Sequence, residues 1–286
     1  MTQPEAENDA EAGAEAGGET GAETGAGTDA ETTGRHGHFR YPRHDRFIGA
    51  SLARYGEYSE AEFNVLRHLF KPGTVVVEAG ANIGALTVPI ARLAGPRGRV
   101  IAFEPQAAVR RLLEANLALN DIGNTEVRGE AVGDRPGIAR IPVPDYAATG
   151  NFGGIALAEE GEEVPLVRLD DVITAPRLQL LKLDIEGMEL AALTGAARLI
   201  ARDRPLIYLE NNPGPGSAPL ISAVMEMGYQ AYWDLPPLYN PDNYRGEAEN
   251  IFGRIVSINM LCIPAERGTT LPDPITSADA RPGPGF

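Results

Sequence analysis

The chain has almost no cysteine and no apolar run of the length that a membrane-spanning helix needs. Cys262 is the only cysteine among 286 residues, which excludes an intramolecular disulfide. It lies in an apolar run and is predicted to be a buried, small hydrophobic residue. The N-terminus has neither the basic nor the apolar region of a secretory signal. We therefore expect a cytoplasmic protein without a membrane partner.

Basic residues are missing from the first 34 positions, which contribute −9 to the formal net charge of −15. This segment also lacks aromatic residues and, after Met1, large aliphatic ones. Because it cannot bury enough apolar surface to offset chain entropy, residues 1–34 are predicted to be a disordered acidic tail. Residues 265–286 are rich in proline and glycine and are expected to be loose. The overall acidity argues against binding to nucleic acid, which requires a basic surface.

Between these tails, aliphatic runs alternate with stretches of helical periodicity. Residues 35–72 are predicted to be an N-terminal cap segment with a helix, and residues 73–264 one α/β domain. Such alternation is typical of a mostly parallel sheet with helices on both faces. Helices are predicted at 59–69, 85–93, 106–119, 188–200 and 220–227. Strands are predicted at 74–79, 100–103, 125–132, 138–142, 178–183, 206–209, 229–233 and 256–263.

A glycine turn, A-G-A-N-I-G, follows the first strand of this domain and contains Gly80, Asn82 and Gly84. The order strand, turn, helix, strand, acid is that of an adenosine-binding unit. The turn lacks the G-x-G-x-x-G pattern that admits a pyrophosphate, so it indicates an adenosine cofactor without phosphates. An ordinary strand–helix loop that needs positive φ is the alternative. Glu104 favours the site, because an acid at this position can accept both ribose hydroxyls.

Acidic residues end four of the predicted strands: Glu78, Glu104, Asp184 and Glu210. Ligands of parallel sheets bind beyond the carboxyl ends of the strands. Lys182 and Asp184 are two residues apart on a strand and therefore share a face. Charges inside a sheet are costly unless paired, so the two form either a pair that supports the fold or a functional pair facing the cofactor. Their place at the edge favours the functional pair.

Amide and carboxylate groups also follow the fifth strand. Asp184, Glu210 and Asn211 offer oxygen ligands of the kind that Mg²⁺ prefers. The same groups can bind or deprotonate a substrate hydroxyl, so the presence of a metal is left open.

Two long loops are candidates for contact with a substrate. Residues 234–252 include Asn243 and Tyr244, which we expect to bind a polar substrate, although a turn-rich surface loop would have the same composition. Residues 144–163 are polar and rich in glycine, and are expected to form either a lid or a flexible loop.

Together these motifs resemble those of the FkbM-type S-adenosylmethionine-dependent methyltransferases, over roughly residues 73–264. Glu78 stands where that family usually has aspartate, with the same charge. The most specific block is K-L-D-I-E-G-M-E-L-A-A-L-T-G-A. The other matching segments are V-E-A-G-A-N-I-G, A-F-E-P-Q, L-L-E-A-N-L-A-L-N, E-A-V-G-D, L-D-D-V and R-P-L-I-Y-L-E.

The resemblance implies a Rossmann-like class I methyltransferase fold with a seven-stranded sheet, six strands parallel and the last antiparallel. It implies S-adenosyl-L-methionine as the cofactor and a hydroxyl of a natural product or sugar as the typical acceptor. By position, Glu104 would hold the ribose and Asp184 would lie near the sulfonium. The full set of cofactor-binding residues implied by position is Glu78, Gly80, Asn82, Gly84, Glu104, Pro105, Glu130, Ala131 and Asp184.

For the chemical step, Asp184 or Glu210 is the candidate base, and Lys182 would tune either one. The turn disfavours a nicotinamide dehydrogenase. A nucleic-acid amino-methyltransferase would have an N-P-P-Y-like segment where D-I-E-G stands. A non-catalytic cofactor-binding protein and a Mg²⁺-dependent O-methyltransferase remain alternatives on the same fold. The expected partner is a small hydroxylated acceptor.

Overall fold

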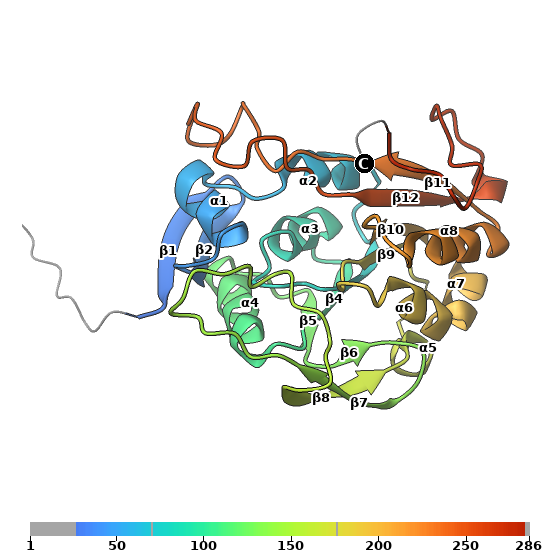
Figure 1. The fold of residues 1–286 in the computed structure, drawn as a ribbon, viewed down its shortest axis with the longest axis horizontal. Helices are drawn as coiled ribbons and strands as arrows, with labels where there is room; N and C mark the ends of the chain where they lie inside the picture. Colours follow the sequence, from blue (N-terminus) through green and yellow to red (C-terminus); the bar gives the residue numbers. More distant parts are fainter. Residues whose placement is uncertain (1–26, 70, 176, 284–286) are drawn as a thin grey trace, which may run out of the picture.

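A computed structural model describes residues 27–69, 71–175 and 177–283, and a seven-stranded sheet organises it (Figure 1). Strand β12 runs antiparallel to both of its neighbours, and the remaining neighbouring strands are parallel. The class I fold is thereby confirmed. The spatial order is β11 (Tyr229–Asp234), β12 (Asn259–Pro264), β10 (Leu206–Glu210), β9 (Leu180–Leu183), β3 (Val75–Ala79), β4 (Arg99–Phe103) and β5 (Thr125–Arg128).

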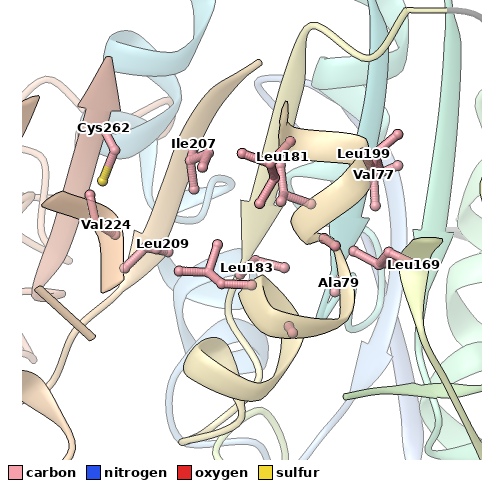
Figure 2. Packing of buried hydrophobic residues seen from close by; sticks show 14 of the residues in the cluster. Val77, Ala79, Leu169, Leu181, Leu183, Leu199, Ile207, Leu209, Val224 and Cys262 are labelled. Carbon is pink, nitrogen blue, oxygen red and sulfur yellow. The ribbon is translucent and has the colours of Figure 1, made fainter. Parts of the chain in front are cut away.

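Helices cover both faces of this sheet, because successive side chains of its strands point to opposite faces. On one face, Val77, Leu181 and Ile207 join a core with residues of the later helices (Figure 2). On the other, Val76 and Leu180 pack with the earlier helices. The later helices are α5 (Leu169–Val172), α6 (Glu189–Gly195), α7 (Ala197–Asp203) and α8 (Ser217–Glu226). The earlier helices are α1 (Ile48–Tyr55), α2 (Glu60–Leu69), α3 (Thr87–Ala94) and α4 (Ala107–Leu119).

Two smaller sheets were not predicted from the sequence. Strands β1 (Asp29–Gly34) and β2 (Gly37–Pro42) form an antiparallel hairpin beside α4. The prediction of disorder over 1–34 is therefore wrong for residues 29–34, while residues 1–26 lie outside the described part. The second sheet has the order β6 (Ala131–Val132), β8 (Glu162–Val167) and β7 (Gly137–Ile141).

Some predicted boundaries are also corrected. The strand expected over 125–132 is divided between β5 and β6, which belong to different sheets. The helix expected over 188–200 is interrupted at Ala196, between α6 and α7. The C-terminal segment is not wholly loose, because the 3₁₀ helix η1 (Ala265–Arg267) follows β12 and Ile275 is buried in the core. As predicted, Cys262 is a fully buried residue of the core (Figure 2).

Candidate functional site

The turn after β3 brings three polypeptide segments into close contact. Gly80 has φ +86°, and a Cβ built there would lie 1.8 Å from the backbone oxygen of Asp184. Only glycine therefore allows the ends of β3 and β9 to approach this closely. Asn82 also has positive φ, at 50°, and its backbone N–H donates to Glu104 Oε2 over 2.9 Å. The turn is thus fixed to the ends of both neighbouring strands.

Glu104, directly after β4, is 3% exposed and anchors this turn. Its second carboxylate oxygen accepts a hydrogen bond from the backbone N–H of Gln106, also over 2.9 Å. Burial raises the pKa of Glu104 to about 7, although both hydrogen bonds oppose this effect. Each oxygen keeps a free lone pair, so the oriented carboxylate can accept further hydrogen bonds from a pair of ligand hydroxyls.

A polar row crosses the sheet beside the turn. In register, Glu78 lies opposite Lys182, and Lys182 lies opposite Tyr208. Lys182 is 2% exposed, and its Nζ lies 3.2 Å from Asp184 Oδ2 and 3.5 Å from Glu62 Oε1. Burial alone would lower the pKa of Lys182, but the three surrounding carboxylates raise it further than burial lowers it. The predicted Lys182–Asp184 pair is thus present, with Glu62 as an additional partner.

Glu78 contributes a buried carboxylate that is only partly satisfied. Within residues 27–69, 71–175 and 177–283, no hydrogen-bond partner reaches its Oε2 atom. Burial raises the pKa of this side chain to about 7. A buried acceptor without a partner is costly, and a ligand ammonium group would satisfy it.

Two adjoining cavities open over these strand ends and share Gly80, Glu104, Gly153, Asp184 and Glu186. The first contains about 500 Å³ of empty space, part of which is open to solvent. Pro105, Glu130 and Ala131, which the resemblance assigns to cofactor binding, line it just after β4 and β5. The other lining residues are largely apolar: Phe103, Val132, Ile141, Ile155, Leu157 and Met188.

The predicted lid segment covers part of this first cavity. Phe152 is buried, and its backbone oxygen accepts a hydrogen bond from Gln106 Nε2 over 3.1 Å. Its ring packs on Tyr146 at a centroid distance of 4.8 Å. Of the two alternatives left open for residues 144–163, the structure favours a packed lid.

The second cavity, with about 1040 Å³ of empty space that is partly open to solvent, is lined by most of the charged residues. Asp184 and Glu210 line it together with Glu186, and one carboxylate oxygen of each lies within 4.8 Å of the others. Burial, followed by the charge of Asp184, raises the pKa of Glu186 to about 7 and also raises the pKa of Glu210. The three oxygens are spaced so that one cation could contact all of them. Glu186 was missed as a site residue, although it belongs to the K-L-D-I-E-G block.

Other predicted site residues lie elsewhere. Gly84 faces Leu113 of α4 and is not among the residues that line either cavity. The Asn211 amide donates to Met260 Sδ over 3.3 Å and does not join the carboxylate group. In place of Asn211, the neighbouring Asn212 lines the second cavity.

Asn243 and Tyr244 also lie away from both cavities. The Asn243 amide donates to two backbone oxygens of its own loop, those of Asn240 and Glu247. The backbone N–H of Tyr244 donates to Glu57 Oε2 over 2.8 Å, and its side chain is half exposed. The Asn243 amide and the Tyr244 backbone N–H hold the loop in place, and the role of both residues in substrate binding stays a prediction. Nothing in the sequence predicts the contact between Tyr244 and Glu57, because the two residues are 187 positions apart.

Comparison with known proteins supports one family. The Methyltransferase FkbM domain matches residues 78–231, more than half of the chain. The AMB antimetabolite synthetase AmbE of Pseudomonas aeruginosa is 34% identical over 164 residues, covering 43% of this chain and 8% of that protein. Methyltransferase sdnD of Sordaria araneosa is 27% identical over 190 residues, covering 53% of this chain and 71% of the relative.

A ribosomal RNA large subunit methyltransferase E of Acidithiobacillus ferrooxidans is 26% identical over 132 residues, which is 46% of this chain and 59% of the relative. The chain therefore spans less than two thirds of this protein and of AmbE. A crystal structure of methyltransferase FkbM from Methylobacillus flagellatus aligns with a TM-score of 0.46 at 22% identity, covering 67% of this chain and 44% of that one. With an RNA methyltransferase among the relatives, the comparisons do not support the predicted exclusion of nucleic acid. Within the described residues, none of the helices combines the length and the apolar character required for crossing a membrane.

Proposed function

The chain belongs to the FkbM methyltransferase family, and from this premise we propose that it transfers a methyl group from S-adenosyl-L-methionine to a hydroxyl oxygen of a small molecule. The residues fit the cofactor. Glu104 offers free lone pairs for two ribose hydroxyls, and the unpartnered oxygen of Glu78 suits the ammonium group. When bound, the cofactor supplies an electrophilic methyl group on a positively charged sulfur.

The observation that carries the proposal is the place of Asp184, where the two cavities meet. A ligand with its adenine in the first cavity would have its reactive end beside Asp184, and an acceptor in the second cavity would meet it there. Such alignment provides much of the acceleration in a displacement reaction. The nearby carboxylates attract a cation, the more so where water is excluded.

Proton removal from the acceptor hydroxyl is the task left to the protein. Asp184 is the proposed base, held in orientation by Lys182 at 3.2 Å. Glu210 is the alternative base, but its raised pKa favours the protonated form and weakens its case.

Methyl transfer to a panel of hydroxylated small molecules tests the proposal, with Asp184→Asn and Glu210→Gln compared for turnover and for affinity toward S-adenosylhomocysteine. We expect Asp184→Asn to lower turnover by about 10²-fold or more, with affinity changed much less. Glu126→Gln, in a surface pair with Arg99, is the control. Unchanged turnover in both variants would rule out these residues as the base. Cofactor binding without transfer to any acceptor would favour the non-catalytic alternative.

A metal-dependent O-methyltransferase is a second candidate, favoured by the grouping of Asp184, Glu186 and Glu210. Oxygen ligands of this kind suit Mg²⁺. Addition of a chelator decides between the two, because full activity in its presence would exclude the metal-dependent reaction.

A further inference from the structure

An apolar wall lines part of the second cavity. It consists of Phe47 and Ile48 at the start of α1, together with Leu238 and Ile255 from the segment before β12. All four lie outside residues 78–231, the part that matches the family domain. The wall is therefore a feature of this chain that the family match does not account for. Figure 1 shows the orange segment before β12 running beside α1 and α2.

Contacts between distant parts of the chain hold this wall in place. Leu238 and Phe252 pack with Tyr55 in a small buried cluster, to which Phe47 adds its ring. The rings of Phe47 and Phe252 stack at a centroid distance of 6.2 Å. The Tyr55 hydroxyl donates to the Glu249 backbone oxygen over 2.8 Å. The apolar surface thus exists before any acceptor binds.

Glu57 connects the two halves of the wall. It is 4% exposed, and its carboxylate accepts hydrogen bonds from Asn240 Nδ2 and from the Tyr244 backbone N–H, each over 2.8 Å. Arg35 Nε completes the arrangement at 2.6 Å. A carboxylate buried with three donors fixes the position of the loop.

The same cavity is rich in acidic side chains. Glu62, Glu78, Glu104, Asp184, Glu186 and Glu210 line it, against Lys182 as the only cationic side chain among its described lining residues. Lys182 is already paired with Asp184 and Glu62. Among the ion pairs of the described residues, none includes Glu186 or Glu210. A phosphate or carboxylate placed there would meet like charge on each of these groups that is ionised, and such a contact costs several kcal/mol at an interface.

We propose that this cavity selects a small amphipathic acceptor, with an apolar body against Phe47, Leu238 and Ile255 and an uncharged or positively charged hydroxyl-bearing end toward Glu186 and Glu210. Phosphate-bearing small molecules are disfavoured by the same acidic groups. The inference rests on the proposed methyl transfer and adds the class of acceptor to it.

The proposal is tested by measuring how four simple probes bind to the full chain. The protein is first saturated with S-adenosylhomocysteine, and the buffer contains a chelator. The probes are 3-phenylpropan-1-ol, 3-phenylpropylamine, 3-phenylpropyl phosphate and glycerol. Ligand-observed NMR measures the binding of each one. We expect the alcohol and the amine to bind at least about tenfold more tightly than the phosphate and glycerol. Ile255→Ser, at a half-exposed position of the wall, should weaken binding of the alcohol about fivefold. Leu238→Ala should do the same or more.

Ile251→Ser is the matched control, because Ile251 is similarly exposed on the same segment but does not line the cavity. It should leave probe binding unchanged. The double variant Glu186→Gln/Glu210→Gln should improve binding of the phosphate. Equal binding of phosphate and alcohol, no effect of Ile255→Ser, or no binding of any probe would overturn the inference. Calorimetry with S-adenosylhomocysteine alone separates the two levels: no binding there refutes the proposed function itself.

Discussion

The two cavities meet at Asp184, but the chain builds them in different ways. The smaller cavity is lined mainly by the ends of β3, β4 and β9 and the residues that follow them, with Ile141 added from the end of β7, and Gly153, Ile155 and Leu157 from the chain between β7 and β8. The larger one is closed by α1 and by the segment before β12, which are held together by contacts such as Asn240 to Glu57, 183 positions apart. Local motifs therefore build most of the smaller cavity, the cofactor half of the site, and long-range packing builds the apolar wall of the larger cavity, the acceptor half.

The largest expected effect is on the turn that both halves share. Gly80→Ala would place a Cβ 1.8 Å from the Asp184 backbone oxygen at a positive φ, so we expect a loss of about 3 kcal/mol in the free energy of unfolding, or no folded protein. Thermal unfolding measures it. Gly73→Ala is the control, since Gly73 has φ +95° but nothing within 4 Å. Equal losses in both variants would show that backbone strain alone, and not the contact with β9, requires glycine at position 80.

The next effect should be confined to the cofactor half. Glu104→Gln removes the negative charge of the side chain. It also replaces one carboxylate oxygen, which accepts a hydrogen bond from a backbone N–H, by an amide group that can only donate. We expect affinity for S-adenosylhomocysteine to fall about 100-fold, measured by calorimetry. Binding of amphipathic probes in the acceptor half should change much less. An affinity within threefold of the unchanged protein would contradict the assignment of Glu104 to the ribose.

A variant of the acceptor half should show the reverse pattern. Glu57→Gln disturbs the carboxylate that holds the loop, so we expect unfolding to become easier by about 2 kcal/mol, with cofactor affinity within about twofold. Glu31→Gln, in an exposed pair with Arg40, is the matched control and should cost about 0.5 kcal/mol or less. If Glu57→Gln impaired cofactor binding as strongly as Glu104→Gln, the two halves would not be separable.

The smallest expected effect is a pH dependence of the cofactor half. Burial raises the pKa of Glu78 and of Glu104 from 4.5 to about 7. Between pH 4.5 and about 7, the folded protein therefore binds more protons at these two groups than the unfolded chain does. Their contribution to the free energy of unfolding falls as the pH rises through this range. Ligand ammonium and hydroxyl groups prefer the ionised carboxylates. Affinity for S-adenosylhomocysteine should thus increase about tenfold from pH 6 to pH 8, and less in Glu104→Gln; a flat profile would contradict the assignment of both residues.

The same difference between local motifs and long-range packing explains how much of the fold and of the site could be predicted from the sequence. The strand-end acids, the turn and the Lys182–Asp184 pair follow from periodicities that a strand imposes on neighbouring residues. Asn243 and Tyr244 were predicted from the composition of their loop, and composition cannot distinguish a side chain that binds a ligand from one that holds its own loop. The hairpin of β1 and β2 was missed for a similar reason. Six residues of low apolar content form a strand there because β2 offers backbone partners, which local propensity does not reveal.

A crystal structure of the full chain with S-adenosylhomocysteine tests most directly whether the cofactor half and the acceptor half meet at one reaction centre. The ribose hydroxyls should lie within hydrogen-bonding distance of the Glu104 carboxylate, the adenine should lie beside Ala131, and the sulfur should face Asp184 with the larger cavity open beyond it. A ligand bound at any other part of the sheet, or one whose sulfur points away from Asp184, would contradict this arrangement.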